Sequence, residues 1–139
     1  MRGIRVLAVD DNADLVDLTA EALEREDEAF SVTTETDPED ALARLRDGRI
    51  DGVVSDYDCV VSDYDMPGMD GLEVLAEVRS DYPEIPFILF TGKGSEEIAA
   101  EAISNGVTDY LQKEGGLDQY TLLANRIKNG VKQYRATKE

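Results

Sequence analysis

Short apolar segments alternate with amphipathic segments five times along this chain of 139 residues, and this alternation restricts the possible folds more than any single motif. Successive apolar residues indicate strands that are buried on both faces, which is typical of a parallel sheet covered by helices on each side. The apolar segments lie at residues 4–9, 30–34, 53–65, 87–90 and 107–111. The sequence therefore predicts an α/β fold with a doubly wound, five-stranded parallel sheet, and residues 1–139 are expected to form a single domain.

The amphipathic segments carry residues that favour helix ends. Candidate N-caps precede three of them, at Asn12, Asp37 and Ser95. Glycine ends the second segment at Gly48 and follows the fourth in the pair Asn105-Gly106. Another helix is expected at residues 71–80, and a last one after the Gly115-Gly116 pair.

Polar side chains follow the predicted strands where these end. They are Asp10 and Asp11 after the first strand, Asp63 or Asp56 after the third, Thr91 after the fourth and Lys113 after the fifth. Since the carboxyl ends of parallel strands meet at one edge of a sheet, these groups are expected to converge there. Clustered carboxylates repel one another unless a cation neutralises them, and oxygen ligands with open positions suit Mg²⁺. With an amine and a hydroxyl nearby, such a carboxylate can attack phosphorus, which predicts an aspartyl phosphate.

The hexamer VVSDYD occurs twice, at residues 53–58 and 60–65, with Cys59 between the copies. Either copy could supply the buried third strand, so the phosphoacceptor could be Asp56 or Asp63. Only the second copy continues into Met66-Pro67-Gly68, where Pro and Gly allow a tight turn that valines resist. The second copy is therefore expected to form the strand, and residues 52–58 to form an exposed, mobile loop at the opposite end of the sheet.

The composition is strongly acidic, with 31 acidic and 14 basic residues and a net charge of −17. Such a charge makes nucleic acid and anionic membrane surfaces poor partners. The acids are spread along the whole chain, which suggests a halophilic cytoplasm where salt screens their repulsion. No apolar run has the length of a membrane span or a signal peptide, so a cytoplasmic location is expected. The chain has no histidine, which excludes a Ser-His-Asp triad and a phosphohistidine of its own.

Four motifs resemble the receiver domain of two-component response regulators, in that family's order and spacing over nearly the whole chain. They are Val9-Asp10-Asp11-Asn12, SDYDMPGMDG from Ser62 to Gly71, Phe90-Thr91-Gly92, and Asp109-Tyr110-Leu111-Gln112-Lys113. The resemblance implies a flavodoxin-like fold, as in chemotaxis regulators, with the strand order 2-1-3-4-5.

The resemblance also implies a role for each site residue. Asp63 would be the phosphoacceptor, and Tyr110 the aromatic side chain that moves inward when the domain switches. Thr91 and Lys113 would bind the phosphoryl group. The implied Mg²⁺ ligands are Asp10 (through water), Asp11, Asp63 and the backbone carbonyl of Asp65.

By the same resemblance, the phosphoryl group comes from the phosphohistidine of a sensor histidine kinase. The domain would not be an enzyme in the usual sense, because it would only phosphorylate itself and slowly dephosphorylate itself. An output domain or partner protein would contact the surface from Ser95 to about Tyr134, which holds the fourth helix, fifth strand and fifth helix.

Two features depart from the family pattern. The family usually has a proline in a cis peptide bond after the rim lysine, whereas Glu114 follows Lys113 here. The duplication inserts seven residues where the family has none. Upstream of the third strand, such an insertion would leave the metal loop intact.

Two other classes of function compete with this interpretation. The Asp63-Tyr64-Asp65 motif resembles the nucleophile motif of haloacid-dehalogenase-like phosphatases, which place it after the first strand rather than the third. A receiver-like binding module that no longer accepts phosphate is the other alternative. The complete set of acids, threonine and lysine argues against that alternative, and the duplication keeps it open.

Overall fold

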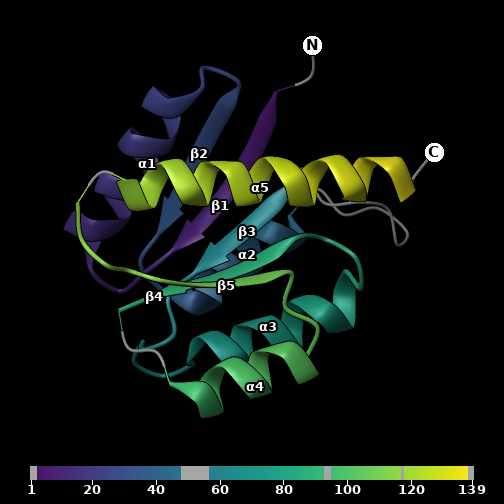
Figure 1. Cartoon of the computed structure of the whole chain (residues 1–139). Helices are drawn as coiled ribbons and strands as arrows, with labels where there is room; N and C mark the ends of the chain where they lie inside the picture. The colour runs from purple at the N-terminus through teal and green to yellow at the C-terminus, as the bar shows by residue number, and fades with distance from the viewer. Residues whose placement is uncertain (1–2, 48–56, 93–94, 117, 138–139) are drawn as a thin grey trace.

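The computed structural model describes residues 3–47, 57–92, 95–116 and 118–137. In these residues, strands and helices alternate from the first strand to the last helix (Figure 1). The strands are β1 (Ile4–Val9), β2 (Phe30–Glu35), β3 (Cys59–Ser62), β4 (Phe87–Thr91) and β5 (Asp109–Gln112). The helices are α1 (Ala13–Glu26), α2 (Pro38–Arg46), α3 (Gly71–Asp81), α4 (Glu96–Ser104) and α5 (Asp118–Thr137).

The strands form one parallel sheet in the order β2-β1-β3-β4-β5, which confirms the expected α/β fold and strand order. Strand β3 lies at the centre, between β1 and β4. Its register pairs Val9 with Ser62, so the residues that follow β1 and β3 leave the sheet side by side.

Side chains alternate between two apolar layers along each central strand. In β1, Ile4 and Val6 pack on the side of α1 and α5, whereas Leu7 and Val9 pack on the side of α2, α3 and α4. Figure 1 shows α5 crossing one face of the sheet, with α3 and α4 on the other. Both faces of β3 and β4 are therefore buried, which explains their uninterrupted apolar sequences.

Polar side chains cap the helices at the residues that the sequence indicates. Asn12 accepts a hydrogen bond from the Leu15 amide, Asp37 from the Glu39 amide and Ser95 from the Ile98 amide. Asp70 and Glu73 form a reciprocal capping box at the start of α3. These local bonds fix where the helices begin, and hence where the preceding loops from the sheet edge end. The predicted stop at Gly48 lies outside the described residues.

The second hexamer copy supplies β3, as expected, because Val60, Val61 and Ser62 lie in the strand. Most of residues 52–58 fall outside the described part, but the expectation of an exposed loop is wrong for Tyr57 and Asp58. Tyr57 is only 6% exposed. Asp58 donates its amide to the Arg5 carbonyl and accepts the Arg5 amide, at 2.8 and 2.9 Å. The chain is thus already packed against β1 before the second copy begins.

Strand β5 begins two residues later than predicted. The Val107 amide donates to the Ala102 carbonyl at 3.0 Å and closes the turn after α4, so Val107 is not part of the sheet. The ladder with β4 starts where Asp109 lies opposite Ile88. In the described residues no peptide bond is cis, and the bond between Lys113 and Glu114 is trans.

Candidate functional site

The site lies at the carboxyl edge of the sheet, where β1, β3, β4 and β5 end. The Asp63 amide donates to the Val9 carbonyl at 2.9 Å, which continues the β1–β3 ladder one step past β3. This bond places Asp63 next to Asp10. On the other side of β4, the Lys113 amide donates to the Thr91 carbonyl at 2.9 Å. Backbone pairing alone therefore brings the predicted residues of four strands to one place.

Three carboxylates cluster at this edge. One oxygen from each of Asp10, Asp11 and Asp63 lies within 4.8 Å of the others. Asp10 is buried and accepts the Asn12 amide on Oδ1 at 2.9 Å, whereas Asp11 is exposed and Asp63 half-buried. The donor set consists of oxygen atoms only, with one exposed face, and this is the set that Mg²⁺ prefers. The residues present therefore fit this cation.

The electrostatics of the cluster favour a cation. Burial raises the pKa of Asp63 above its usual value, and the Lys113 charge and a Thr91 hydrogen bond oppose this rise. The pKa of Asp11 is also raised, first by partial removal from water and then by the negative charge of Asp10. Both carboxylates are harder to ionise than free ones, so a bound divalent cation would stabilise their charged forms.

Lys113 contacts the cluster from the β5 side. Its Nζ lies 2.6 Å from Asp10 Oδ2 and 3.9 Å from Asp63 Oδ1, and its side chain is 17% exposed. The ammonium also lies 5.5 Å from the centre of the Phe90 ring. The sequence predicted that Lys113 lies near Asp63, and the structure adds that the Asp10 carboxylate is closer to its ammonium.

The remaining predicted residues take distinct positions. Thr91 ends β4 and is fully buried beside Asp63. Asp65 is exposed in the loop after β3, and its charge adds to the rise in the Asp11 pKa. Tyr110 in β5 is half-buried, and its hydroxyl is buried without a hydrogen-bond partner in the described part of the chain. The structure thus brings Asp10, Asp11, Asp63, Thr91 and Lys113 together, with Asp65 in the loop beside them and Tyr110 in β5 opposite Leu89 of β4.

Three further residues support the site, and the sequence analysis did not assign them this role. The buried Ser62 hydroxyl donates to the Asp63 carbonyl at 2.8 Å. Gly71 donates its amide to the Tyr64 carbonyl at 2.8 Å, and a Cβ there would collide with the Asp63 carbonyl. Phe90 lies beneath Lys113. Of the three, only Gly71 could have been noticed from the sequence, because it directly follows the N-cap Asp70 at the start of a predicted helix.

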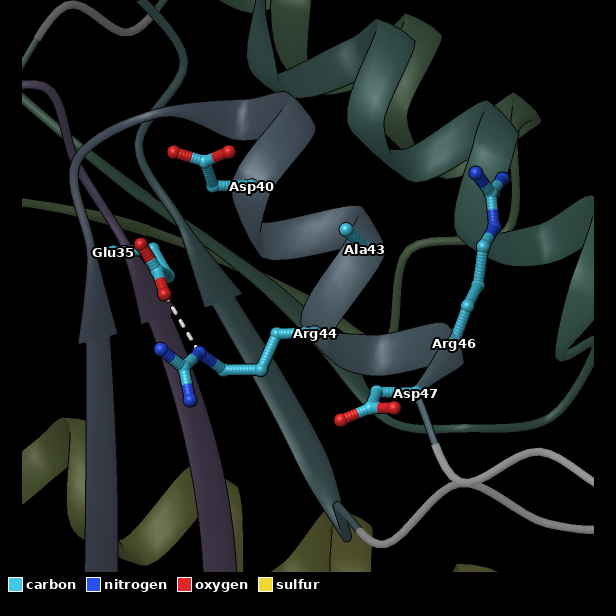
Figure 2. A pocket seen from close by; sticks show the side chains of 6 residues that line it. All are labelled: Glu35, Asp40, Ala43, Arg44, Arg46 and Asp47. Atoms are coloured by element: carbon cyan, nitrogen blue, oxygen red, sulfur yellow. Dashed lines mark hydrogen bonds and ion pairs between the residues drawn. The ribbon is translucent and has the colours of Figure 1, made fainter.

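A separate hollow of about 730 Å³ lies between β2 and α2 (Figure 2). Arg44 points toward Glu35 and pairs with it at 2.6 Å, whereas Arg46 points away toward α3 and pairs with Asp81 at 2.5 Å. Both arginines are therefore paired with acids of this chain. None of the three clustered carboxylates lines this hollow, so the sheet edge remains the candidate site.

A parallel sheet in this order, with clustered acids, a threonine and a lysine at its carboxyl edge, defines the class of the protein. Residues 6–125 match the response regulator receiver domain, and the chain belongs to this family. Receiver domains are signalling domains rather than classical enzymes, and they bind Mg²⁺ at an acidic pocket of the kind found here.

Curated relatives include regulators from several bacteria. The chain is 31% identical over 134 residues to the nitrogen assimilation regulatory protein NtrX of Azorhizobium caulinodans, covering 96% of this chain and 28% of NtrX. It is 34% identical over 117 residues to the transcriptional regulatory protein TcrA of Mycobacterium tuberculosis, covering 84% and 43%. It is 30% identical over 129 residues to the response regulator SaeR of Staphylococcus aureus, covering 93% and 52%. The chain thus spans about half or less of the length of these relatives.

Solved structures show the same fold. A receiver domain protein from Clostridium thermocellum superposes with a TM-score of 0.83 at 22% identity, covering 96% of this chain and 98% of that one. The chemotaxis protein CheY4 of Vibrio cholerae gives 0.75 at 28% identity, covering 90% and 98%. In the parts of the chain that the structure describes, no helix is both long enough and apolar enough to cross a membrane.

Proposed function

We propose that this domain accepts a phosphoryl group on Asp63 from the phosphohistidine of a partner histidine kinase. The observation that carries this proposal is the convergence of Asp10, Asp11 and Asp63 within 4.8 Å, with the Lys113 ammonium 3.9 Å from Asp63. Membership of the receiver family supports the same role. These 139 residues contain no histidine, so the phosphohistidine that donates the group lies outside them.

The chemistry assigns a task to each group. A carboxylate oxygen of Asp63 attacks the phosphorus, a new P–O bond forms, and the P–N bond to the donor imidazole breaks. The electron pair of the broken bond stays on the imidazole nitrogen, which takes up a proton. Lys113 provides positive charge, and Thr91 a hydroxyl, for the oxygens of the arriving group. The buried position of Thr91 limits the access of water to that side of the acyl phosphate.

The residues that would hold Mg²⁺ are Asp10, Asp11, Asp63 and the backbone carbonyl of Asp65. When bound, the cation would neutralise charge on the carboxylates and the phosphoryl oxygens. Asp10 is already engaged by the Asn12 amide and by Lys113, which supports an indirect role for it, through water.

The output surface would consist of α4, β5 and α5. Tyr110 lies in β5 directly opposite Leu89, and its hydroxyl has no hydrogen-bond partner in the described residues. Because no hydrogen bond from the described residues fixes this hydroxyl, the Tyr110 side chain can change position when Thr91 moves toward the phosphoryl group. We propose that a cytoplasmic partner or an output domain contacts this surface, and that residues 1–139 act as one domain. Slow loss of the phosphoryl group by hydrolysis would reset the switch.

Incubation with acetyl phosphate and Mg²⁺, followed by peptide mass spectrometry, tests the function. We expect one acid-labile phosphoryl group on Asp63. The variant Asp63→Asn should abolish the label, whereas Asp56→Asn, in the matching position of the first copy, should keep it. Labelling at Asp56 would contradict the site assignment, and no label on either residue would favour a binding module without phosphotransfer. Many turnovers of a phosphomonoester would instead indicate a phosphatase.

A further inference from the structure

We propose that Gln119 is a positioning residue for Lys113, acting through the amide of Glu114. Where it concerns the rate of phosphorylation, this inference rests on the proposed function of Asp63. The residue that follows the rim lysine here is Glu114, which has a backbone amide that a proline would lack. That amide donates to Gln119 Oε1 at 3.2 Å. A side chain in the first turn of α5 thus holds the peptide unit next to Lys113.

The connection after Lys113 needs such support. Glu114, Gly115 and Gly116 are exposed, and both glycines have positive φ values, 84° and 79°. Glycine restricts the backbone little, so this turn is flexible unless other groups hold it. Upstream, Lys113 is fixed by its own amide bond to the Thr91 carbonyl. Downstream, among the described residues, the bond from the Glu114 amide to Gln119 is the one that ties this turn to α5. The backbone of Lys113 is therefore held on one side by β4 and on the other by Gln119.

The position of the Lys113 ammonium depends on this backbone. The ammonium has to reach Asp10 at 2.6 Å and Asp63 at 3.9 Å while it stays over the Phe90 ring. Phe90 is itself fixed, because it is 2% exposed and packs edge-on against Tyr120, with the two ring centres 6.1 Å apart. Gln119 and Tyr120 are neighbours in α5, so this helix supports Lys113 both through the Glu114 amide and through the Phe90 ring.

Acetylation of lysines, followed by mass spectrometry, measures how firmly Lys113 is held, without phosphate or metal. In Gln119→Leu, the Lys113 ammonium should be acetylated about two to ten times faster than in the wild type, which is the range for loss of one neutral hydrogen bond. Lys128 and Lys132, in the same helix, serve as internal controls and should not change. Gln119→Glu keeps an acceptor oxygen and should preserve the wild-type rate. Gln133→Leu is the matched control on an exposed part of α5.

Phosphorylation by acetyl phosphate adds a double-mutant test. Gln119→Leu should slow labelling of Asp63 by about two- to tenfold in the wild-type background. In the Lys113→Met background it should have no further effect, because its influence passes through the lysine. An equal loss in both backgrounds would indicate a general structural role and overturn the proposal.

The two readouts separate the two hypotheses. If the wild type takes no label, the proposed function fails, and lysine acetylation still decides the role of Gln119. If the wild type is labelled but Gln119→Leu matches it in both rate and Lys113 acetylation, the positioning role is wrong while the phosphoacceptor role stands.

Discussion

At the scale of single residues, Asp10 has two possible partners of positive charge. Its Oδ2 lies 2.6 Å from Lys113, and it also belongs to the carboxylate cluster that suits Mg²⁺. Lys113 and a bound divalent cation would therefore neutralise overlapping sets of negative charge. We expect Lys113→Met to bind Mg²⁺ at least about tenfold more tightly, because the carboxylates lose a cation that lies within hydrogen-bond distance of one of them. Isothermal titration at constant ionic strength measures this, and unchanged or weaker binding would contradict it.

A substitution at Asp11 should change the Mg²⁺ affinity in the opposite direction. If Asp11 ligates Mg²⁺ as proposed, Asp11→Asn removes one anionic oxygen ligand from a small site for a hard ion, so Mg²⁺ affinity should fall by about tenfold or more. Asp14→Asn is the matched control, because Asp14 is an exposed acid in the first turn of α1 outside the cluster. An equal loss in both variants would show that long-range charge, rather than ligation, sets the affinity.

Cys59 lies between the hexamer copies and is fully buried at the start of β3. Burial raises the pKa of its thiol far above the usual value, so the reactive thiolate is disfavoured even in mildly alkaline solution. Iodoacetamide at pH 8 should leave the folded protein unlabelled and modify Cys59 quickly in urea. Rapid labelling without denaturant would indicate that the start of β3 opens readily.

At the scale of elements, the two identical Tyr-Asp pairs of the hexamers occupy opposite electrostatic environments. Tyr57 lies under the Arg5 guanidinium at 5.2 Å, and Asp58 pairs with Arg135 at 3.3 Å. In the second copy, the pKa of Tyr64 is raised by burial and then by the negative charge of Asp70. The first pair is thus part of the stabilising packing at the start of β3, and the second belongs to the acidic edge.

Deletion of residues 53–59 tests this difference. It joins Gly52 to Val60, so that Gly52 takes the sequence position of Cys59, the first residue of β3, and Ile50 takes that of Tyr57. Phosphorylation of Asp63 should persist, because everything after Val60 is unchanged. The free energy of unfolding should fall by about 2 kcal/mol or more through lost burial, which outweighs the ~0.6 kcal/mol expected from halving a loop. Urea titration measures this, and a deletion variant as stable as the wild type would show that the first copy contributes nothing.

Elements decided by neighbouring residues could be predicted from the sequence, and contacts between distant residues could not. The helix starts followed from Asn12, Asp37 and Ser95, whose caps act within three residues. The convergence at the sheet edge followed from strand alternation, since parallel strands must end together. The burial of Tyr57 and Asp58 was missed because their partners come from β1 and α5. For the same reason, the sequence did not show that Lys113 approaches Asp10 more closely than Asp63.

At the scale of the whole molecule, the net charge of −17 is a source of self-repulsion. Ion pairs such as Arg126–Asp109 and Lys128–Asp27 offset only part of this repulsion, because the basic residues are few compared with the acids. Salt largely screens the repulsion between exposed charges that lie further apart than the Debye length, which is about 10 Å at 0.1 M and about 3 Å at 1 M. We expect the free energy of unfolding to rise as KCl increases from 0.1 to 1 M. Urea titrations at each concentration check this, and a decrease would show that ion pairs outweigh repulsion.

The place where the hexamer is repeated also decides how the gene for this domain can change length. Because the extra copy lies upstream of β3, the second copy stays joined to Met66-Pro67-Gly68. The residues at the carboxyl edge of β3 therefore follow one another in the sequence without an insertion. The same repeat placed after Asp63 would separate the proposed phosphoacceptor from its turn, and we expect it to abolish phosphorylation. Natural selection acting on phosphotransfer would therefore ignore gains and losses of whole copies on one side of Asp63 and remove them on the other. Length variation among descendants of this gene should accumulate ahead of the third strand.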